Sequence, residues 1–543
     1  MEASPGTLQR LGTFELMTAR FDRDRHLKSA VNRTDPWDLI IIGGGASGVG
    51  CALDAVTRGL SVLLLEGTDF GKGTSSRSTK LIHGGVRYLR QGNFSLVRES
   101  LRERTRLLRN APHLVHPIEF ILPCRSLMEI GYYSLGMNVY DWLASSPEFH
   151  RSKRLSKEQV LSKQINLSPN NLSGGISYFD GQFDDSRLLI NLVQTAAEKG
   201  AILVNAARVI DLTKNRSGKI EGVVFCEEET GKTHMARGRC VLNATGPFCD
   251  FVRRLDQPDT TPLVAASQGI HLVLGKEFFP GESALIVPKT RDGRVMFIIP
   301  WHEHVLLGTT DTAIPEAREE PQALDEEIAF LLETAGEYLR KCPARDDCLS
   351  VFAGIRPLVK AQRGVSTSSL SRDHTMEVSA TGLLTLTGGK WTTYRQMAED
   401  CVDRVLKLLG RPYTPSKTHD LRLHGYPQGT QQSGSMANAV YGSDAVLLEQ
   451  LVNDEPSLGQ RLHPDLPIRG AEVVWAIRHE WARTIEDVLA RRTRALFLNA
   501  HAAMEMAPMV VRLLASELDR DDTWQAAQLA SFQQTASIYM LNG

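Results

Sequence analysis

Asp38-Leu-Ile-Ile-Ile-Gly-Gly-Gly-Ala-Ser-Gly48 is the stretch that decides the fold of the N-terminal part of this chain. Its apolar run predicts a strand buried on both faces, which continues directly into a glycine-rich turn. The residues from Val49 to Arg58 predict a helix that ends at Gly59, and Leu60 to Glu66 predict a second buried strand. A strand, a helix and a second strand within about 30 residues form a βαβ unit.

The glycine spacing Gly43-x-Gly45-x-x-Gly48 permits a tight turn, a close approach to a pyrophosphate and close packing of helix on strand. The pyrophosphate would lie at the helix N-terminus, where free N–H groups favour negative charge. Glu66 follows Gly48 by 18 residues and is expected to accept from a ribose hydroxyl, which argues against NADP. The fingerprint alone leaves NAD and FAD open. Its place early in a long chain favours FAD, as does Val241-Leu-Asn-Ala-Thr-Gly246, which resembles a second FAD signature of flavoproteins.

Composition excludes several classes of protein. The 543 residues predict about three or four domain-sized units, and 42% apolar with 23% charged residues is typical of a globular chain. A net charge of −1 argues against a nucleic-acid binder. The eight cysteines contain no Cys-x-x-Cys pair, so we expect neither a metal site nor a disulfide framework, and reduced thiols suit the cytosol. No stretch approaches the roughly 20 apolar residues of a membrane-spanning helix.

The N-terminal segment, residues 1–35, lacks the pattern of a signal peptide. It carries an apolar stripe at near-helical spacing with arginines between its members. The apolar residues are Leu8, Leu11, Phe14, Met17 and Phe21, and the arginines are Arg10, Arg20, Arg23 and Arg25. Such a stripe could lie on a membrane surface, but packing against the protein's own core is the commoner arrangement.

Later segments predict a second sheet and a helical C-terminal region. Apolar runs at 271–274, 283–287, 295–299 and 305–307, separated by turns, predict antiparallel strands. A helix is expected over 323–339 and another over about 393–409, after a short strand at 383–387. A linker is expected over 426–434, and helices over 472–489 and 508–533.

The most informative stretch is Thr74-Ser-Ser-Arg-Ser-Thr-Lys-Leu-Ile-His-Gly-Gly-Val-Arg-Tyr-Leu89. Its hydroxyls suit flavin phosphates or ribityl oxygens, and the glycines after His83 let backbone pass close to a flat ring. With this stretch, the sequence closely resembles FAD-dependent, respiratory glycerol-3-phosphate dehydrogenases, within the D-amino-acid-oxidase-like flavoproteins. The resemblance covers about Trp37 to Asn499. It includes Gly308-Thr-Thr-Asp311, Gly354-Ile-Arg-Pro-Leu358, Ser371-Arg-Asp-His-Thr375, Gly388-Gly-Lys-Trp-Thr-Thr-Tyr394 and the C-terminal segment 483–494.

The resemblance implies an α/β fold with a Rossmann-like, doubly wound FAD-binding domain, an inserted antiparallel-sheet substrate domain and an α-helical C-terminal domain. The expected boundaries are 1–35 for an N-terminal segment; 36–120, 175–255 and 350–410 for the FAD-binding domain; 121–174 and 256–349 for the substrate domain; 411–434 for a linker; and 435–543 for the helical domain.

The resemblance also assigns site residues. FAD is expected to contact Gly43, Gly45, Ser47, Gly48, Glu66, Thr74, Ser75, Ser76, Leu81, Ile82, His83, Ala244, Thr245, Gly246, Gly389, Lys390 and Thr392. The substrate cavity is expected to contain Arg87, Tyr88, His271, Arg356, Arg372, Lys390 and Thr392. Several convergent cations suit a dianionic phosphate ester. The catalytic group is expected to comprise His271, Arg87, Arg356 and Lys390. His271 is the base favoured on pKa grounds, with hydrogen-bonding positioning as the alternative. Trp391 stands where a smaller aliphatic residue is expected.

The implied reaction oxidises sn-glycerol 3-phosphate to dihydroxyacetone phosphate by hydride transfer from C2 to FAD. A membrane quinone is the usual acceptor, which implies a peripheral enzyme on the inner face of the cytoplasmic membrane; a homodimer is also a prediction. The alternative is an oxidase that passes electrons to oxygen and releases hydrogen peroxide, although no long insertion of the oxidase kind is seen. An amine or amino-acid oxidase and a flavin-bearing tRNA-modifying protein are less favoured, because of the cationic residues and the balanced charge.

Overall fold

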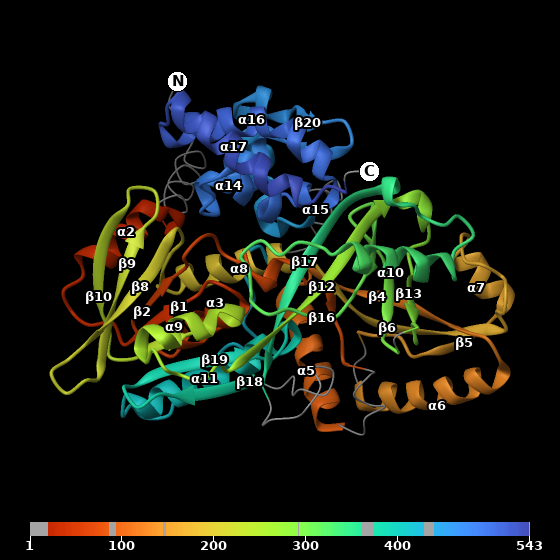
Figure 1. Cartoon of the computed structure of the whole chain (residues 1–543), viewed down its shortest axis with the longest axis horizontal. Helices are drawn as coiled ribbons and strands as arrows, with labels where there is room; N and C mark the ends of the chain where they lie inside the picture. The colour runs from red at the N-terminus through yellow and green to blue at the C-terminus, as the bar shows by residue number, and fades with distance from the viewer. Residues whose placement is uncertain are drawn as a thin grey trace, which may run out of the picture.

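The computed structural model describes residues 20–85, 94–144, 148–291, 293–360, 374–427 and 439–541. Figure 1 shows two sheets lying side by side, with the C-terminal helices above them. The first sheet is six-stranded, in the order β18-β19-β11-β1-β2-β7. Its strands are β18 (His374–Val378), β19 (Leu383–Gly388), β11 (Val241–Asn243), β1 (Leu39–Ile42), β2 (Val62–Leu65) and β7 (Ile202–Val204).

This first sheet is parallel except at its edge, where β18 runs antiparallel to β19. Every residue of β1 and β2 is buried, as their apolar sequences predict. Helix α3 (Ala46–Thr57) connects β1 to β2 and contacts both α8 (Asp185–Glu198) and α11 (Tyr394–Leu408). The predicted strand-helix-strand unit is therefore present, with the helix beginning three residues before the expected start at Val49.

A small antiparallel sheet and a short helix flank the first sheet. The small sheet contains β8 (Ala207–Lys214), β9 (Ile220–Glu227) and β10 (Lys232–Arg237), and α9 (Cys249–Asp256) lies nearby. Helix α2 (Arg23–Asn32) contacts β7 and β10. Phe21, just before α2, is 1% exposed and lies against Trp481, so this member of the N-terminal stripe packs on the protein itself. Leu8, Leu11, Phe14 and Met17 lie outside the described residues.

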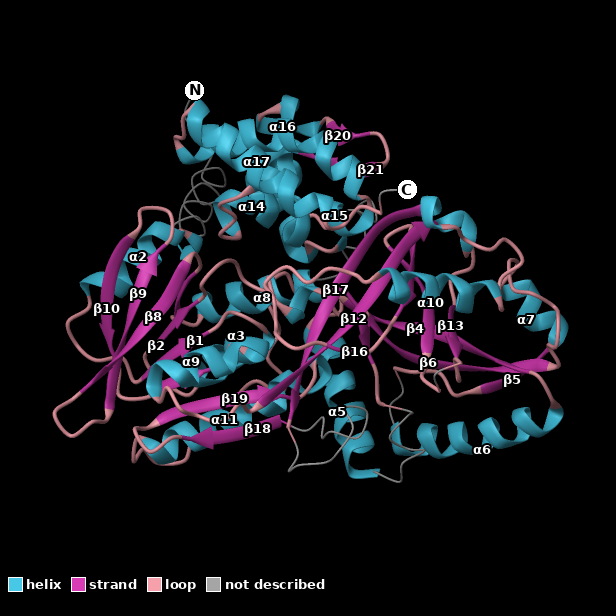
Figure 2. Ribbon diagram, viewed as in Figure 1, coloured by secondary structure: helices cyan, strands magenta, loops and turns pink. Residues whose placement is uncertain are grey.

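The second sheet is ten-stranded and lies beside the first sheet (Figure 2). Its strands are β3 (Leu81–Ile82), β4 (Val115–Cys124), β5 (Lys153–Ser156), β6 (Gly174–Phe183), β12 (Val264–Gly275), β13 (Ala284–Val287), β14 (Met296–Trp301), β15 (His304–Gly308), β16 (Thr312–Ala313) and β17 (Cys348–Val359). Its helices are α5 (Phe94–Asn110), α6 (Leu127–Ala144), α7 (Lys157–Lys163) and α10 (Asp325–Gly336).

Two details of this sheet differ from the sequence-based expectation. The sheet is antiparallel except where β13 pairs with β4 in parallel, because a long excursion of the chain separates these two strands. Strands β6 and β17 lie within ranges expected for the FAD-binding domain, yet they pair with β4 and β12 in the second sheet. The long β12–β17 ladder thus carries residues next to the first sheet, since β17 also contacts β19.

The C-terminal region is helical, as predicted, but its helix boundaries differ. It contains α13 (Ala445–Asp454), β20 (Arg461–His463), β21 (Leu466–Arg469), α14 (Gly470–His479), η9 (Asp487–Arg492), α15 (Ala495–Leu498), α16 (Ala500–Leu518) and α17 (Asp522–Ser537). The single helix expected over 508–533 is wrong: Asp519 is left-handed with φ 51°, and Asp521 caps a new helix. The helix expected over 472–489 also ends early, at His479, before the left-handed Trp481.

Candidate functional site: a flavin turn beside a buried histidine

The glycine turn leaves the N-terminus of α3 open. Gly43 has φ 108°, a conformation that glycine adopts without strain, and Gly45 is the N-cap residue without a side-chain cap. A Cβ on Gly48 would overlap the carbonyl oxygen of Gly43, so only glycine lets helix and strand pack this closely. A Cβ on Gly45 would instead lie 3.1 Å from Ser75 Oγ, in the space that faces the helix end. These residues fit a pyrophosphate, because its negative charge is stabilised by the free backbone N–H groups at the N-terminus of α3.

Glu66 lies beside this turn at the end of β2. Its Oε2 accepts from the N–H of Gly44 at 2.6 Å, and its Oε1 accepts from the N–H of Thr68 at 2.9 Å. Burial raises the pKa of Glu66, against the opposing effect of the Thr68 and Gly44 hydrogen bonds. The carboxyl group is thus fixed next to the turn, and its contact with a ribose hydroxyl remains a prediction.

Three other predicted cofactor segments follow strands or turns near the same edge. Ala244 to Gly246 follows β11, and Gly389 to Thr392 follows β19; both strands run parallel to β1, so their carboxyl ends meet at one edge of the sheet. The turn Thr74–Ser76 joins them: Ser75 Oγ accepts from the N–H of Ala46 at 3.0 Å, and the carbonyl oxygen of Ser75 accepts from Trp391 Nε1 at 2.8 Å. The structure therefore brings these segments together around the glycine turn.

The contacts of Trp391 show why a large side chain stands where a smaller aliphatic residue was expected. Its ring lies 5.4 Å from that of Phe183 and 5.5 Å from that of Tyr394, measured between centroids. Together with its hydrogen bond to Ser75, these contacts connect the loop after β19 to the second sheet and to α11. The indole therefore fixes the loop that carries Lys390 and Thr392.

The segment after Ser76 crosses from the first sheet to the second. Thr74 Oγ1 donates to the carbonyl oxygen of Ile355 at 2.6 Å. Leu81 and Ile82 form β3, which pairs with β6, and His83 follows it. Ser47 lies within the first turn of α3. All predicted cofactor residues thus lie in the described part of the chain, and the turn they surround fits FAD.

His271 lies on β12 and is 2% exposed. Its Nε2 is 3.0 Å from Thr79 Oγ1, and its ring stacks on Phe352 at a centroid distance of 4.9 Å. Within the described residues, its Nδ1 has no hydrogen-bond partner. Burial, and then the positive charges of Lys80 and Arg356, hold the pKa of His271 well below its usual value of 6.5. The imidazole is therefore neutral at pH 7, with one unprotonated ring nitrogen.

Arg356 reaches the same region from β17. Its guanidinium donates to the carbonyl oxygen of Thr310 at 3.0 Å and to Thr309 Oγ1 at 3.2 Å, and Nη1 lies 3.4 Å from Asp311 Oδ1. The register of the ladder places Arg356 opposite Ser267, four residues from His271 on β12 and on the same face. The β12–β17 ladder thus brings a cation and a neutral base to one side of the sheet.

The other predicted substrate residues fall into two groups. Lys390 precedes η6 (Trp391–Thr393), and Thr392 within it is buried, so both lie at the edge of the first sheet that β17 approaches. Arg87, Tyr88 and Arg372 lie outside the described residues. Within the described residues, no group of three histidine, cysteine or acidic side chains could hold a metal ion.

Sequence reasoning missed two neighbours of His271, although both stand in the quoted stretch 74–89. Thr79 contacts the imidazole directly. Lys80, whose side chain is fully buried, donates to Asp185 Oδ2 at 2.7 Å and to the carbonyl oxygen of Ser76 at 2.8 Å. Its ammonium lies 5.1 Å from the centroid of the Phe352 ring, and burial together with Arg494 lowers the pKa of Lys80 to about 7. The sequence offered no distinct signal for either residue, because Thr79 and Lys80 continue the polar run Thr74-Ser-Ser-Arg-Ser78.

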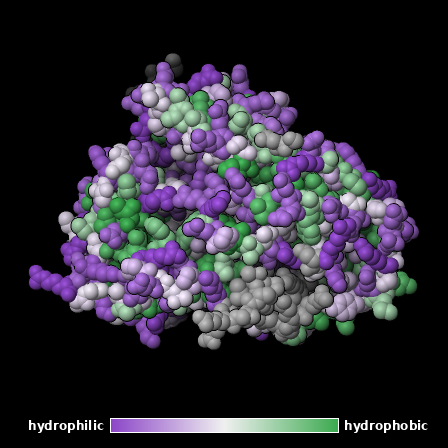
Figure 3. Space-filling view, in the orientation of Figure 1, coloured by the Kyte–Doolittle hydropathy of each residue, from purple (hydrophilic) through white to green (hydrophobic). Residues whose placement is uncertain are grey.

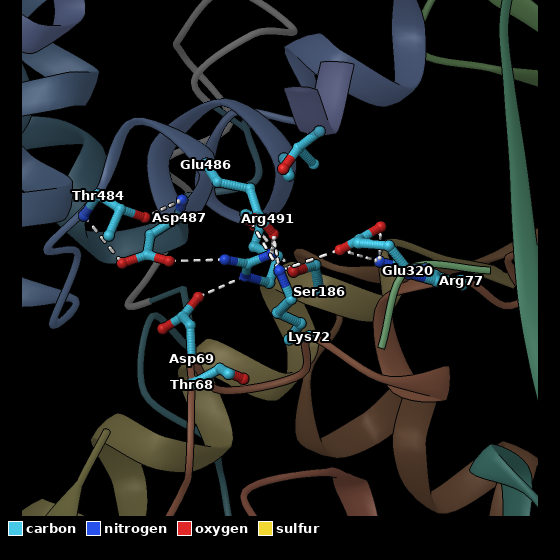
Figure 4. A network of polar contacts seen from close by, with 12 residues as sticks. Thr68, Asp69, Lys72, Arg77, Ser186, Glu320, Thr484, Glu486, Asp487 and Arg491 are labelled. Carbon is cyan, nitrogen blue, oxygen red and sulfur yellow. Dashed lines mark hydrogen bonds and ion pairs between the residues drawn. The ribbon is translucent and has the colours of Figure 1, made fainter. Parts of the chain in front are cut away.

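The C-terminal domain connects to this site through buried ion pairs (Figure 4). Arg491 pairs with Asp69, with Glu486 at 2.6 Å and with Asp487 at 2.6 Å. Lys72 pairs with Glu486 at 2.7 Å and with Glu320 at 3.0 Å. Glu320 in turn pairs with Arg77 at 2.8 Å, so the network joins the loop after β2, the loop between β16 and α10, and η9.

A glycine turn at the edge of a parallel sheet, with a second sheet that brings His271 and Arg356 toward this edge, fits an FAD-dependent oxidoreductase. The sequence model of the family described as "FAD dependent oxidoreductase" matches residues 38–395, and that described as "C-terminal domain of alpha-glycerophosphate oxidase" matches 379–525. The chain is 40% identical over 528 residues to a probable mitochondrial glycerol-3-phosphate dehydrogenase of Caenorhabditis elegans, covering 92% of this chain and 73% of that protein. It is also 40% identical to a mitochondrial glycerol-3-phosphate dehydrogenase of Arabidopsis thaliana, covering 92% and 86%.

Solved structures agree with these matches. The glycerol-3-phosphate dehydrogenase from Bacillus halodurans complexed with FAD is similar with a TM-score of 0.78 and 26% identity, over 97% of this chain and 99% of that one. An L-alpha-glycerophosphate oxidase from Mycoplasma pneumoniae, at 18% identity and a TM-score of 0.55, shares the fold over 71% of this chain and 97% of that one. The chain belongs to the FAD-dependent glycerol-3-phosphate dehydrogenase family, and FAD is its cofactor.

Proposed function

We propose that this chain oxidises the C2 hydroxyl of sn-glycerol 3-phosphate to the ketone of dihydroxyacetone phosphate. The observation that supports this most directly is the buried, neutral His271 on the same sheet face as Arg356, next to the edge that carries the flavin turn. A neutral base beside a cation suits an alcohol whose other end carries a phosphate. The relatives named as glycerol-3-phosphate dehydrogenases support the same substrate.

Each residue has a proposed part in this reaction. Arg356 and Lys390, with Arg87, Tyr88 and Arg372 from outside the described residues, bind the phosphate ester, and Thr392 adds a hydroxyl. If Nε2 of His271 carries its proton and donates to Thr79 Oγ1, then Nδ1 is the atom that accepts the C2 hydroxyl proton. Bound FAD supplies the acceptor for the hydride that leaves C2.

We further propose that the electrons pass to a membrane quinone and that the enzyme attaches peripherally to the membrane containing it. In the described part of the chain, no helix combines the length and the apolar character needed to cross a bilayer. Attachment at the inner face of the cytoplasmic membrane and a homodimer stay predictions. Reduction of a quinone analogue without release of hydrogen peroxide would distinguish the dehydrogenase from the alternative oxidase.

The test of the substrate is Lys390→Met. A charge-assisted hydrogen bond to phosphate contributes about 1.5–3 kcal/mol, so kcat/KM for glycerol 3-phosphate should fall at least about tenfold with FAD still bound. Lys407→Met, an exposed change on α11, is the matched control and should leave kcat/KM unchanged.

Unphosphorylated glycerol completes this test. It should be a very poor substrate for the parent enzyme and lose little further in Lys390→Met, because the interaction with phosphate is absent. Equal losses on both substrates would assign Lys390 to the flavin or to folding. Efficient oxidation of glycerol by the parent enzyme would contradict the proposed substrate.

A further inference from the structure

Lys80 is a buried lysine that follows directly on the residue in contact with the proposed base. Lysine side chains normally lie at the surface, where Figure 3 shows many hydrophilic residues, yet Lys80 is 0% exposed. Its neighbour Thr79 has its hydroxyl 3.0 Å from His271 Nε2. A buried ammonium group loses its hydration, so the fold has to supply other partners for it. The surroundings of Lys80 therefore bear on the base as well as on the fold.

The backbone at Lys80 is left-handed, with φ 64°, a conformation that costs free energy in a residue other than glycine. Two hydrogen bonds hold it: the N–H of Lys80 donates to Ser78 Oγ at 3.1 Å, and its carbonyl oxygen accepts from the N–H of Phe183 at 3.1 Å. Asp185 fixes Ser78, because its Oδ2 accepts from the Ser78 N–H at 3.0 Å and from Ser78 Oγ at 2.7 Å. Thr79 thus lies within a turn that is held on both sides.

The ammonium group of Lys80 shares its acceptors with a guanidinium group of the C-terminal domain. Lys80 Nζ donates to Asp185 Oδ2 at 2.7 Å and to the carbonyl oxygen of Ser76 at 2.8 Å. Arg494 Nη2 donates to the same carbonyl oxygen at 2.9 Å and to Asp185 Oδ1 at 3.1 Å. The side chain of Lys80 therefore joins its own turn to the cofactor turn that ends at Ser76, to α8 and to the C-terminal domain.

Three aromatic rings also lie near the ammonium group. Lys80 Nζ is 5.1 Å from the ring centroid of Phe352, 5.2 Å from that of Trp301 and 5.4 Å from that of Phe497. An ammonium group near an aromatic face is attracted by the charge distribution of the ring. Phe352 also stacks on His271, with 16° between the two ring planes. One phenyl ring thus contacts both the lysine and the proposed base.

We propose that Lys80 is a positioning residue for His271: it holds Thr79 against Nε2 and keeps a positive charge close to the imidazole. This inference rests on the proposed function, because it concerns the base of that reaction. Lys80 acts on His271 through its own turn, which carries Thr79, and through Phe352. Neither route requires Lys80 to touch the substrate, so its loss should affect kcat more than KM.

The charges around the two residues give the sign of the effect on pH dependence. Lys80 faces Asp184 and Asp185 from α8 and Arg494 from the C-terminal domain, and His271 faces Lys80 and Arg356. Burial, and then the charge of Arg494, lower the pKa of Lys80 to about 7. Lys80 is therefore mostly protonated below pH 6.5, and its charge opposes protonation of His271 there.

The experiment measures kcat and KM against pH for the FAD-bound chain, with glycerol 3-phosphate and a soluble dye as electron acceptor. Lys80→Met replaces the ammonium group with a neutral side chain of similar length. The acid-side midpoint of kcat/KM should move to higher pH by at least about 0.5 unit, because a positive charge near His271 is removed. At pH 7, kcat should fall about fivefold, as for the loss of one hydrogen bond, while KM changes less than about twofold.

Two further variants separate the charge from its structural surroundings. Lys80→Arg keeps the positive charge and should keep the acid-side midpoint near that of the parent. Lys72→Met is the matched control: Lys72 lies at the same junction with the C-terminal domain and pairs with Glu486 at 2.7 Å and Glu320 at 3.0 Å (Figure 4). Its removal should lower the free energy of unfolding in urea but leave the midpoint unchanged.

The outcomes distinguish this inference from the proposed function. A midpoint that is equal in Lys80→Met and the parent, or that moves equally in Lys72→Met, would overturn the positioning role. If Lys80→Met fails to bind FAD, Lys80→Gln takes its place, since its amide can still donate to Ser76 without a charge. Failure of both neutral variants to fold would assign Lys80 to folding alone. A parent that does not oxidise glycerol 3-phosphate would overturn the proposed function, and the inference with it.

Discussion

Residues from separate parts of the chain determine the protonation state of His271. Thr79 lies on its Nε2 side, Phe352 stacks on its ring, and the positive charges of Lys80 and Arg356 oppose its protonation. The hydrogen bond between His271 Nε2 and Thr79 Oγ1 matters because, when Nε2 is the donor, Nδ1 is the nitrogen without a proton. The proposed proton acceptor, Nδ1, therefore depends on a residue 192 positions away in the sequence.

Thr79→Val should lower kcat/KM for glycerol 3-phosphate about fivefold to tenfold with unchanged FAD content. The loss of one hydrogen bond contributes about 1 kcal/mol, and either tautomer of His271 then becomes accessible. Thr79→Ser keeps the hydroxyl and should restore most of the activity. Steady-state kinetics and flavin absorbance measure both quantities. Equal losses in the two variants would show that the methyl group matters and the hydroxyl does not.

The pH profile tests the same base independently. The pKa of His271 is lowered, so its neutral form persists below pH 6.5, and kcat/KM should fall only as pH drops through that lowered value. The falling limb on the acid side should therefore have its midpoint below 6.5. A midpoint at or above 6.5 in the free enzyme would mean that His271 is not the titrating base.

The resemblance supplied His271, Arg356 and Lys390 as candidates, whereas their supporting contacts could not be predicted. Residue types that suit a phosphate ester or a proton transfer can be recognised in a sequence. The Thr79 and Lys80 contacts depend on which β12 and β17 residues face them, and that follows from the register of the assembled sheet.

Among the elements, the glycine turn is the part that the sequence predicted best. The βαβ unit needs only local patterns: a buried apolar run, three glycines and an acidic residue at the end of the next strand. The break between α16 and α17 was missed, because the segment 508–533 keeps a helical composition through the left-handed Asp519. Only the capping hydrogen bond from Trp524 N–H to Asp521 Oδ1, at 2.8 Å, marks the new start.

Two glycine variants separate cofactor binding from folding in this turn. Gly45→Val places a side chain before the open helix end, so the protein should fold but lose FAD. Gly48→Ala forces a Cβ onto the Gly43 carbonyl oxygen and should lower the free energy of unfolding even without FAD. Flavin absorbance and urea unfolding of the apoprotein distinguish the two effects. Retention of stoichiometric FAD by Gly45→Val would contradict the placement of the pyrophosphate.

At the scale of the molecule, the helical C-terminal domain is joined to the flavin side through buried charge. Asp69, three residues after Glu66, receives hydrogen bonds from Arg492 at 2.6 and 2.8 Å and pairs with Arg491. Sequence patterns predicted a helical domain near its C-terminus but gave no partner for Arg491 or Arg492. The pairing joins positions 423 residues apart, and no local periodicity encodes such a contact.

Burial opposes ionisation of Asp69, but the charges of Arg492 and Arg491 outweigh it and hold the pKa of Asp69 below its usual value. Asp69 therefore stabilises the folded state wherever it is ionised, and this contribution is lost as pH falls below the unfolded-state value of about 4. Without the Asp69 carboxylate, the buried guanidinium groups of Arg491 and Arg492 lose a negative charge that offsets the free-energy cost of burying them.

Asp69→Asn should accordingly lower the free energy of unfolding by about 3–5 kcal/mol at pH 7, measured by urea denaturation of the FAD-bound protein. The difference from the parent should shrink as pH falls below about 4, because the unfolded parent then takes up a proton that the folded parent binds only at lower pH. Asp465→Asn is the matched control: its carboxylate is 65% exposed and lies 4.0 Å from His463, so its removal should cost less than about 1 kcal/mol. If Asp69→Asn unfolds like that control at pH 7, then Glu486 and Asp487 alone compensate the arginines. The C-terminal domain would then be held to the flavin side by its apolar contacts and the remaining ion pairs, such as Lys72 with Glu486, rather than by Asp69.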